Sequence, residues 1–142
     1  EKMIAMGKKA RQAGIKLSIT VLLGLGGREG SEQHAIKTGE VLTAIDPEYV
    51  GALSLMLIPG TELFAEYEAG RFPILEPNEV LRELRTMLAH TDLTDGRFHA
   101  NHASNYLPIK AHLPQDKAQS LRLINRALAG EVDLRPESMR AL

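Results

Sequence analysis

The segment ITVLLGLGGREGSEQHA, residues 19–35, joins an apolar run to four glycines and to the start of a helix. Apolar residues alternate with polar ones up to and into this run, a period of two that is typical of a β-strand. These apolar residues are Ile15, Leu17, Ile19, Val21 and Leu23. The run becomes wholly apolar at its end, as strands buried in parallel sheets do. Ser31 predicts the N-cap of the helix that follows, so the glycines connect a strand to a helix.

The rest of the chain continues this alternation. Spacing and boundary residues predict helices over residues 3–13, 31–45, 62–69, 77–88 and 114–128, and further strands over 49–58 and 96–101. Strands that alternate with helices form parallel sheets through right-handed crossovers. We therefore predict an α/β fold of parallel β/α units with three strands. Three strands leave unpaired edges, which favours a piece of a larger barrel or doubly wound sheet.

Composition and charge restrict the classes of function. The chain has 142 residues, of which 44% are hydrophobic and 25% charged, as in a single globular domain. Its net charge of −1 and its scattered Lys and Arg residues argue against binding of nucleic acid or anionic membranes. No apolar run approaches the roughly 20 residues that span a bilayer. Since the chain has no cysteine, it forms neither disulfides nor thiolate metal sites, and we expect a cytoplasmic protein.

The glycine turn allows two interpretations. Gly24, Gly26 and Gly27 follow the end of a strand, where parallel α/β folds bind ligands, and they precede a helix N-terminus, which favours negative charge. Alternatively, the glycines only make the turn possible. A dinucleotide fingerprint does not fit, because its sixth position is Glu29, and no Gly-Lys-Ser/Thr of a P-loop follows. Glu29 itself is expected either to accept a hydrogen bond from a ligand or to cap the helix.

The densest polar segment is HANHASNYLP, residues 99–108. Five of its side chains offer hydrogen-bonding groups that could orient a polar substrate: Asn101, His102, Ser104, Asn105 and Tyr106. The alternative is a loop whose side chains satisfy its own backbone. The histidine spacing predicts no metal site. A pair of Ser104 and His102 lacks both an elbow motif and an obvious acid, so we assign no catalytic residue.

Several phrases, taken in order, resemble a known family. GLGGRE, residues 24–29, ends one strand, and PEYV, residues 47–50, begins another that ends in PGTEL, residues 59–63. They resemble the C-terminal half of the radical S-adenosylmethionine (radical SAM) core, in the branch of oxygen-independent coproporphyrinogen oxidases and related Fe–S oxidoreductases. FHANHASNYLPIKAHLPQDK, residues 98–117, resembles a phrase of a subgroup of radical SAM proteins. One departure is Gly26, which stands where that family commonly has proline.

The resemblance implies a fold and a site. It covers about residues 1–130 and implies the C-terminal half of a partial (β/α)6 TIM-like barrel, with residues 131–142 as an irregular, loosely held tail. The turn would line the adenosyl part of S-adenosylmethionine through Gly24, Gly26, Gly27 and Glu29, with Leu57 and Ile58 beside the adenine. The substrate would contact Asn101, His102, Ser104, Asn105 and Tyr106.

One defining feature of that family is absent. Its C-x3-C-x2-C motif ligates three irons of a [4Fe–4S] cluster, and this chain has no cysteine. The resemblance therefore implies a fragment of a radical SAM oxidoreductase, or a degenerate relative, that is inactive alone. S-adenosylmethionine and the cluster would belong to the parent protein, which acts on a small molecule. Because the chain opens at Glu1 inside a predicted helix, we expect further residues upstream.

The implied half barrel predicts partners as well. The missing N-terminal half would pair with the exposed strand edges, and without it self-association would cover them. Two other functions stay open at this point. One is a non-catalytic α/β ligand-binding or scaffold module, and the other is a different β/α-barrel enzyme that binds phosphate at the glycine turn.

Overall fold

The alternating apolar residues of the sequence form four strands. The computed structural model describes residues 1–142, and its strands are β1 (Ser18–Leu23), β2 (Tyr49–Ser54), β3 (Gly96–Ala100) and β4 (Ile109–Leu113). They make one open sheet in the order β1-β2-β3-β4. Strands β1, β2 and β3 are parallel, and β4 is antiparallel to β3. The predicted α/β fold is confirmed, and its sheet is mostly but not wholly parallel.

The sheet differs from the prediction in two places. It has four strands and not three, because the segment of β4 pairs with β3 along its whole length. The flanking Pro108 and Pro114 conceal this strand in the sequence, since proline is typical of loops and strand ends. The second difference is that β2 ends at Ser54 and not at residue 58. Its neighbour β1 ends opposite, at Leu23, and leaves residues 55–58 without a partner strand.

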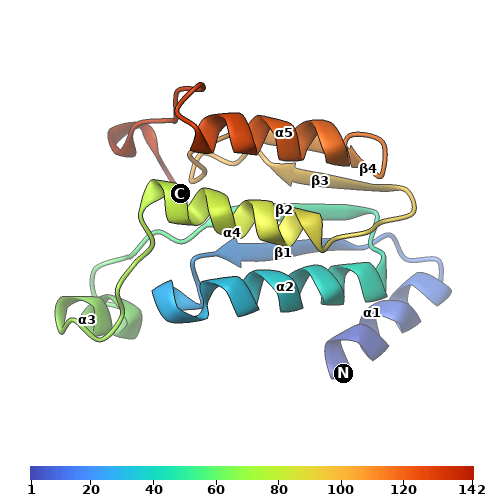
Figure 1. The fold of residues 1–142 in the computed structure, drawn as a ribbon. Coiled ribbons are helices and arrows are strands. Elements are labelled where there is room, and N and C mark those ends of the chain that lie inside the picture. The colour runs from blue at the N-terminus through green and yellow to red at the C-terminus, as the bar shows by residue number, and fades with distance from the viewer.

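Three long helices lie side by side on one face of the sheet (Figure 1). They are α2 (Gly27–Ile45), α4 (Pro77–Ala89) and α5 (Lys117–Leu128). The shorter α1 (Lys2–Gln12) packs against α2, and α3 (Glu62–Glu68) lies beyond the strand ends. Helix α2 begins one turn before the predicted N-cap Ser31, whose hydroxyl instead donates to Glu83 of α4. None of the helices combines the length and the apolar character needed to cross a membrane.

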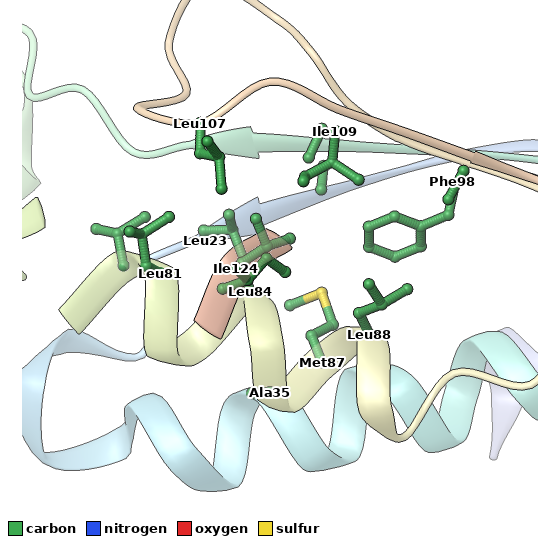
Figure 2. Packing of buried hydrophobic residues seen from close by; sticks show 14 of the residues in the cluster. Leu23, Ala35, Leu81, Leu84, Met87, Leu88, Phe98, Leu107, Ile109 and Ile124 are labelled. Carbon is green, nitrogen blue, oxygen red and sulfur yellow. The ribbon is translucent and has the colours of Figure 1, made fainter. Parts of the chain in front are cut away.

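The core fills the space between the sheet and these three helices (Figure 2). Every second side chain of each strand points into it, and Leu23 of β1 and Phe98 of β3 are fully buried. The helices contribute apolar stripes at helical spacing, which include Leu81, Leu84, Met87 and Leu88 of α4 and Ile124 of α5. Burying such a side chain stabilises a fold by roughly 1.5–3 kcal/mol. The helix layer is therefore held firmly on this face.

The opposite face of the sheet carries no helix. Its side chains alternate with the core residues and are exposed or half-buried, from Thr20 on β1 to Lys110 on β4. A doubly wound sheet has helices on both faces. In this sheet each strand is added on the same side of the one before it. Right-handed crossovers then place all the connecting helices on a single face. The sheet is therefore one-sided and not doubly wound.

The chain after α5 returns to the sheet. The guanidinium of Arg135 donates to three backbone carbonyls within residues 102–105 at 2.7–3.1 Å. That of Arg140 donates to a fourth at 2.7 Å. Residues 131–142 are irregular apart from the short turn Glu137–Met139, and these hydrogen bonds attach them to the segment 102–105. These carbonyls lie outside any strand, so they need donors, and the two arginines supply them.

One acid joins three segments at the end of α2. Asp46 adopts the left-handed conformation with φ +55°. Its carboxylate accepts a hydrogen bond from Arg11 of α1 at 2.9 Å, and from the backbone N–H and the hydroxyl of Thr94 at 2.8 and 2.7 Å. Burial alone would raise the pKa of Asp46, but the bonds from Thr94 and Arg11 outweigh it and hold the pKa below its usual value.

Replacement of Asp46 by Asn tests this junction. Asn tolerates the left-handed conformation but loses the ion pair, so the free energy of unfolding at pH 7 should fall by about 1–3 kcal/mol. Because the folded-state pKa is lowered, the advantage of the wild type should be complete above the unfolded pKa of 3.8. It should shrink as the pH falls from there through the folded-state pKa. Urea unfolding of both proteins across this range measures it, and a difference independent of pH would contradict the assignment.

Candidate functional site

A pocket opens at the C-terminal ends of β1 and β2. Its volume is ≈ 540 Å³, within the usual range of small-molecule sites. Helix α3, the start of α4 and the C-terminal tail complete its walls, which are mostly apolar or aromatic. The lining residues are Leu23, Gly24, Leu55, Met56, Leu57, Phe64, Tyr67, Ile74, Leu75, Glu76, Pro77, Val80, Tyr106, Glu137 and Arg140.

Three residues predicted to bind cofactor or substrate line this pocket. Gly24 and Leu57 come from the group expected at the cofactor, and Tyr106 comes from the group expected at the substrate. The other residues of the cofactor group lie outside the lining: Gly26, Gly27, Glu29 and Ile58. The structure therefore brings together one member of the glycine turn, one residue after β2 and one residue of the polar segment.

The conformation of the turn explains two of its glycines. Gly24 and Gly27 have φ of +87° and +63°, a region that favours glycine. A β-carbon on Gly27 would also lie 3.3 Å from the ring of Phe72. Both residues are needed to make the turn, whether or not a ligand is present.

A buried carboxylate holds this turn. Glu83 of α4 is 2% exposed. Its Oε1 accepts a hydrogen bond from the backbone N–H of Gly24 at 2.9 Å and lies 2.9 Å from Nδ1 of His34, and its Oε2 accepts one from the hydroxyl of Ser31. A buried carboxylate is strongly unfavourable unless such donors surround it. The glycine turn therefore already binds an anion, and that anion belongs to the protein.

The charged residues of the turn point away from the pocket. Glu29 is exposed in the first turn of α2 and makes no capping hydrogen bond, so it acts on the helix only through its charge. Arg28 reaches across to α4, where its Nε lies 2.9 Å from the carboxylate of Glu79. Neither side chain lines the pocket.

Two residues of the polar segment bind the sheet. Ser104 and Asn105 are buried. The hydroxyl of Ser104 accepts from the N–H of Ser54 at 3.1 Å, and the amide of Asn105 donates to the carbonyl of Ala52 at 2.8 Å. The pairing of β2 with β3 stops at Gly51, so these side chains take over the backbone groups that β3 leaves unpaired. Ser104 and Asn105 therefore bond to the backbone of β2 and not to that of their own loop.

The start of the polar segment is exposed. Asn101 and His102 both face solvent. Nδ1 of His102 lies 3.0 Å from the hydroxyl of Ser104, which already accepts from β2, and the ring forms no ion pair with an acid. The pair lacks the third group that orients the base in a nucleophilic triad.

Tyr106 brings the polar segment to the pocket wall. Its hydroxyl donates to Glu137 at 2.7 Å and accepts from Arg140 at 2.6 Å, and the guanidinium lies 4.1 Å from the centre of its ring. Burial and the hydrogen bond to Glu137 raise the pKa of Tyr106 to about 12. The phenol is therefore neutral at pH 7 and gives an otherwise apolar pocket one polar end.

Three residues that shape the turn and the pocket were not predicted from the sequence, and only one of them could have been recognised from its local pattern. Glu83 lies on the apolar stripe of α4 between Val80 and Met87, and an acid at such a position indicates a buried, hydrogen-bonded group. Glu137 and Arg140 left no local signal, because 31 and 34 residues separate them from Tyr106. Only the folded chain brings these groups together.

Comparison with known proteins gives no match: no family model, curated protein or solved structure is similar to the chain. The structure also places no three His, Cys, Asp or Glu side chains where they could hold a metal ion.

Replacement of Glu83 by Ala tests the role of the buried carboxylate. It leaves the N–H of Gly24 unpaired and opens a cavity, so the free energy of unfolding should fall by about 2–4 kcal/mol. The matched control is Glu79→Gln on the same helix, where an exposed ion pair with Arg28 is lost and the change should stay below about 1 kcal/mol. Urea unfolding measures both, and hydrogen exchange should show faster exchange of the Gly24 amide in the first variant alone. Unchanged exchange would contradict the contact.

Replacement of Glu137 by Gln tests the polar end of the pocket. Removing the carboxylate should lower the pKa of Tyr106 from about 12 towards 10. Because the pKa of Tyr106 is raised in the folded state, the neutral phenol stabilises the fold at pH values below the unfolded pKa near 10. This contribution is lost as the pH rises from there through the folded-state pKa of about 12. Absorbance at the phenolate band during a pH titration reports the change. Glu131→Gln, in the same tail but paired with Arg126, should leave the Tyr106 titration unchanged.

Proposed function

We propose that this chain is the C-terminal part of a radical SAM Fe–S oxidoreductase barrel. In this proposal the pocket at β1 and β2 receives the adenosyl end of S-adenosylmethionine, and the segment 101–106 forms one wall of the substrate site. The chain binds and orients the ligand. It has no cysteine and so does not fit the [4Fe–4S] cluster, which the missing N-terminal half would hold.

The meeting of distant residues in one pocket carries the proposal. Gly24 belongs to the GLGGRE phrase, Leu57 precedes PGTEL, and Tyr106 belongs to the polar phrase, yet all three line the same pocket. The pocket lies at the carboxyl ends of parallel strands, where α/β folds place their ligands. Residues within or beside the phrases that resemble the family thus lie together where a ligand is expected.

The chemistry of the pocket suits the adenosyl group. Phe64 and Tyr67 of α3, with ring centres 6.3 Å apart, and Leu57 offer flat or apolar surfaces to a purine. At the polar end, Tyr106, Glu137 and Arg140 form a hydrogen-bonded group whose donors and acceptors face the amino and hydroxyl groups of a bound nucleoside in this proposal.

The arrangement of the sheet also supports a barrel segment. The parallel strands follow one another in sequence order with their helices on one face, as in β/α barrels. The carbonyls of Leu17, just before β1, and of Leu23, at its end, accept hydrogen bonds from the N–H groups of Tyr49 and Leu55. The backbone of Ser18, Thr20 and Leu22 therefore faces away from β2, free to pair with a preceding strand. The missing half would pair there, and in its absence two copies would associate through this edge.

Glu83 argues against the rival enzyme that binds phosphate at the glycine turn. The N–H of Gly24 is already donated to the Glu83 carboxylate at 2.9 Å. A second anion at the turn would meet a buried negative charge. The remaining alternative, a scaffold or binding module without chemistry, predicts that no nucleoside binds in the pocket.

Titration with adenosine and S-adenosylhomocysteine, followed by NMR, tests the proposed pocket. We expect saturable shifts of the methyl groups of Leu57 and Leu75. Leu57→Trp should weaken binding by roughly tenfold or more, because the indole fills the pocket. Met3→Trp on α1, at a side chain that is 71% exposed, should leave binding unchanged. Absence of saturable binding would contradict the adenosyl site.

The oxidoreductase assignment has its own test. Sequencing the gene upstream of the codon for Glu1 should find a C-x3-C-x2-C motif in the same reading frame, after a predicted strand. A stop codon directly upstream, or a long extension free of cysteine, would contradict it and favour the binding module.

A further inference from the structure

The uncovered face of the β3–β4 hairpin is entirely basic. Arg97 and His99 of β3 and Lys110 and His112 of β4 share this face, with Arg97 opposite His112 and His99 opposite Lys110. Side chains at such positions lie about 4.5–5.5 Å apart at their β-carbons. His112, which the sequence places in a loop, thus belongs to a square of four basic residues.

This square lacks the charges that would balance it. His112 alone has an acidic partner, Asp95, at 2.5 Å from its Nε2. The side chains of Arg97 and Lys110 are exposed and form no ion pair or hydrogen bond. Each opposed pair joins one permanent cation to a histidine, so the two permanent cations, Arg97 and Lys110, are diagonal neighbours across the hairpin. No acid of the hairpin pairs with either of them.

A hollow lies beside the square. Gly51 of β2 is the register partner of both Thr20 and His99, so these residues form a row across the sheet that continues to Lys110. A β-carbon on Gly51 would meet nothing closer than Leu53, at 4.0 Å. The missing side chain leaves room on the open face between a hydroxyl and an imidazole.

We propose that this hollow binds a small molecule through a carboxylate or phosphate group. The floor is Gly51, Thr20 offers a hydroxyl, and Arg97, His99 and Lys110 supply cationic or neutral N–H donors. The site is separate from the pocket at the ends of β1 and β2, and it does not depend on the radical SAM assignment. A small ligand fits better than a nucleic acid, because the basic residues are confined to one hairpin of a chain with a net charge of −1.

The pKa of His99 reflects the cations around this site. Partial burial lowers its pKa, and the charges of Lys110 and Arg97 lower it further. The basic groups that face it on its own strand and on β4 are Arg97, Lys110 and His112, and its neighbours on β2 and β1 are Gly51 and Thr20. A bound anion would offset the two cations and raise the pKa of His99.

NMR titrations with pyrophosphate and with citrate test the proposal. Both probes should shift the resonances of Gly51, His99 and Lys110 and raise the pKa of His99. Tighter binding of pyrophosphate would assign the ligand group as phosphate, and tighter binding of citrate would assign it as carboxylate. Arg97→Gln and Lys110→Gln should each weaken binding about fivefold or more. Gly51→Val, which fills the hollow and keeps every charge, should abolish it. Lys8→Gln, at an exposed lysine of α1, is the control and should bind as the wild type does.

Unfolding measurements separate binding from a structural role. Because Arg97 and Lys110 are exposed and their side chains form no ion pair or hydrogen bond, Arg97→Gln and Lys110→Gln should leave the free energy of unfolding unchanged. The proposal is overturned if both variants lower stability, if neither probe binds, or if Lys8→Gln loses as much affinity as they do. Saturation of the same residues by duplex DNA, at concentrations where neither probe binds, would also overturn it in favour of nucleic acid.

Discussion

The carboxylate of Glu83 is the interaction on which the geometry of the pocket depends. It extends from α4, yet its partners lie in the β1–α2 turn and on α2. One buried group therefore fixes a loop, a helix start and a second helix relative to one another. Since a carboxylate removed from water is stable only among its donors, Gly24, Ser31 and His34 are constrained together. Gly24 also lines the pocket, so the position of that wall follows from this contact.

The same internal anion decides what the glycine turn can bind. In nucleotide-binding loops, backbone N–H groups at a helix N-terminus stay free for phosphate. In this chain the N–H of Gly24 is occupied, and the acid that occupies it is buried beneath the turn. Binding at the pocket must then come from apolar walls and from the polar end formed by Tyr106 and Glu137. Such a site is suited to a nearly neutral, flat group such as a purine, and poorly suited to a pyrophosphate.

Local patterns in the sequence were sufficient for most of the fold, because burial of one face of a strand or helix leaves a regular trace. The three parallel strands and the five helices follow from such traces, but the end of β2 does not, because the apolar run continues to Ile58 beyond the last paired residue. Strand β4 does not, since its alternation is brief and lies between Pro108 and Pro114. The start of α2 does not either, because the hydroxyl of Ser31 is bound by an acid 52 residues away. The tail contacts of Arg135 and Arg140 are equally long in range, and no local pattern encodes them.

The two faces of the sheet differ in the kinds of side chain they carry. On the face covered by helices, no inward side chain of any strand is ionisable, and packing accounts for every position. On the open face of β3 and β4, every side chain is basic. Packing against the core does not explain that choice, because these side chains are exposed or half-buried. Apart from Asp95 beside His112, no acid of the chain forms an ion pair with these residues. In the proposal above, the balancing charge is that of a bound ligand.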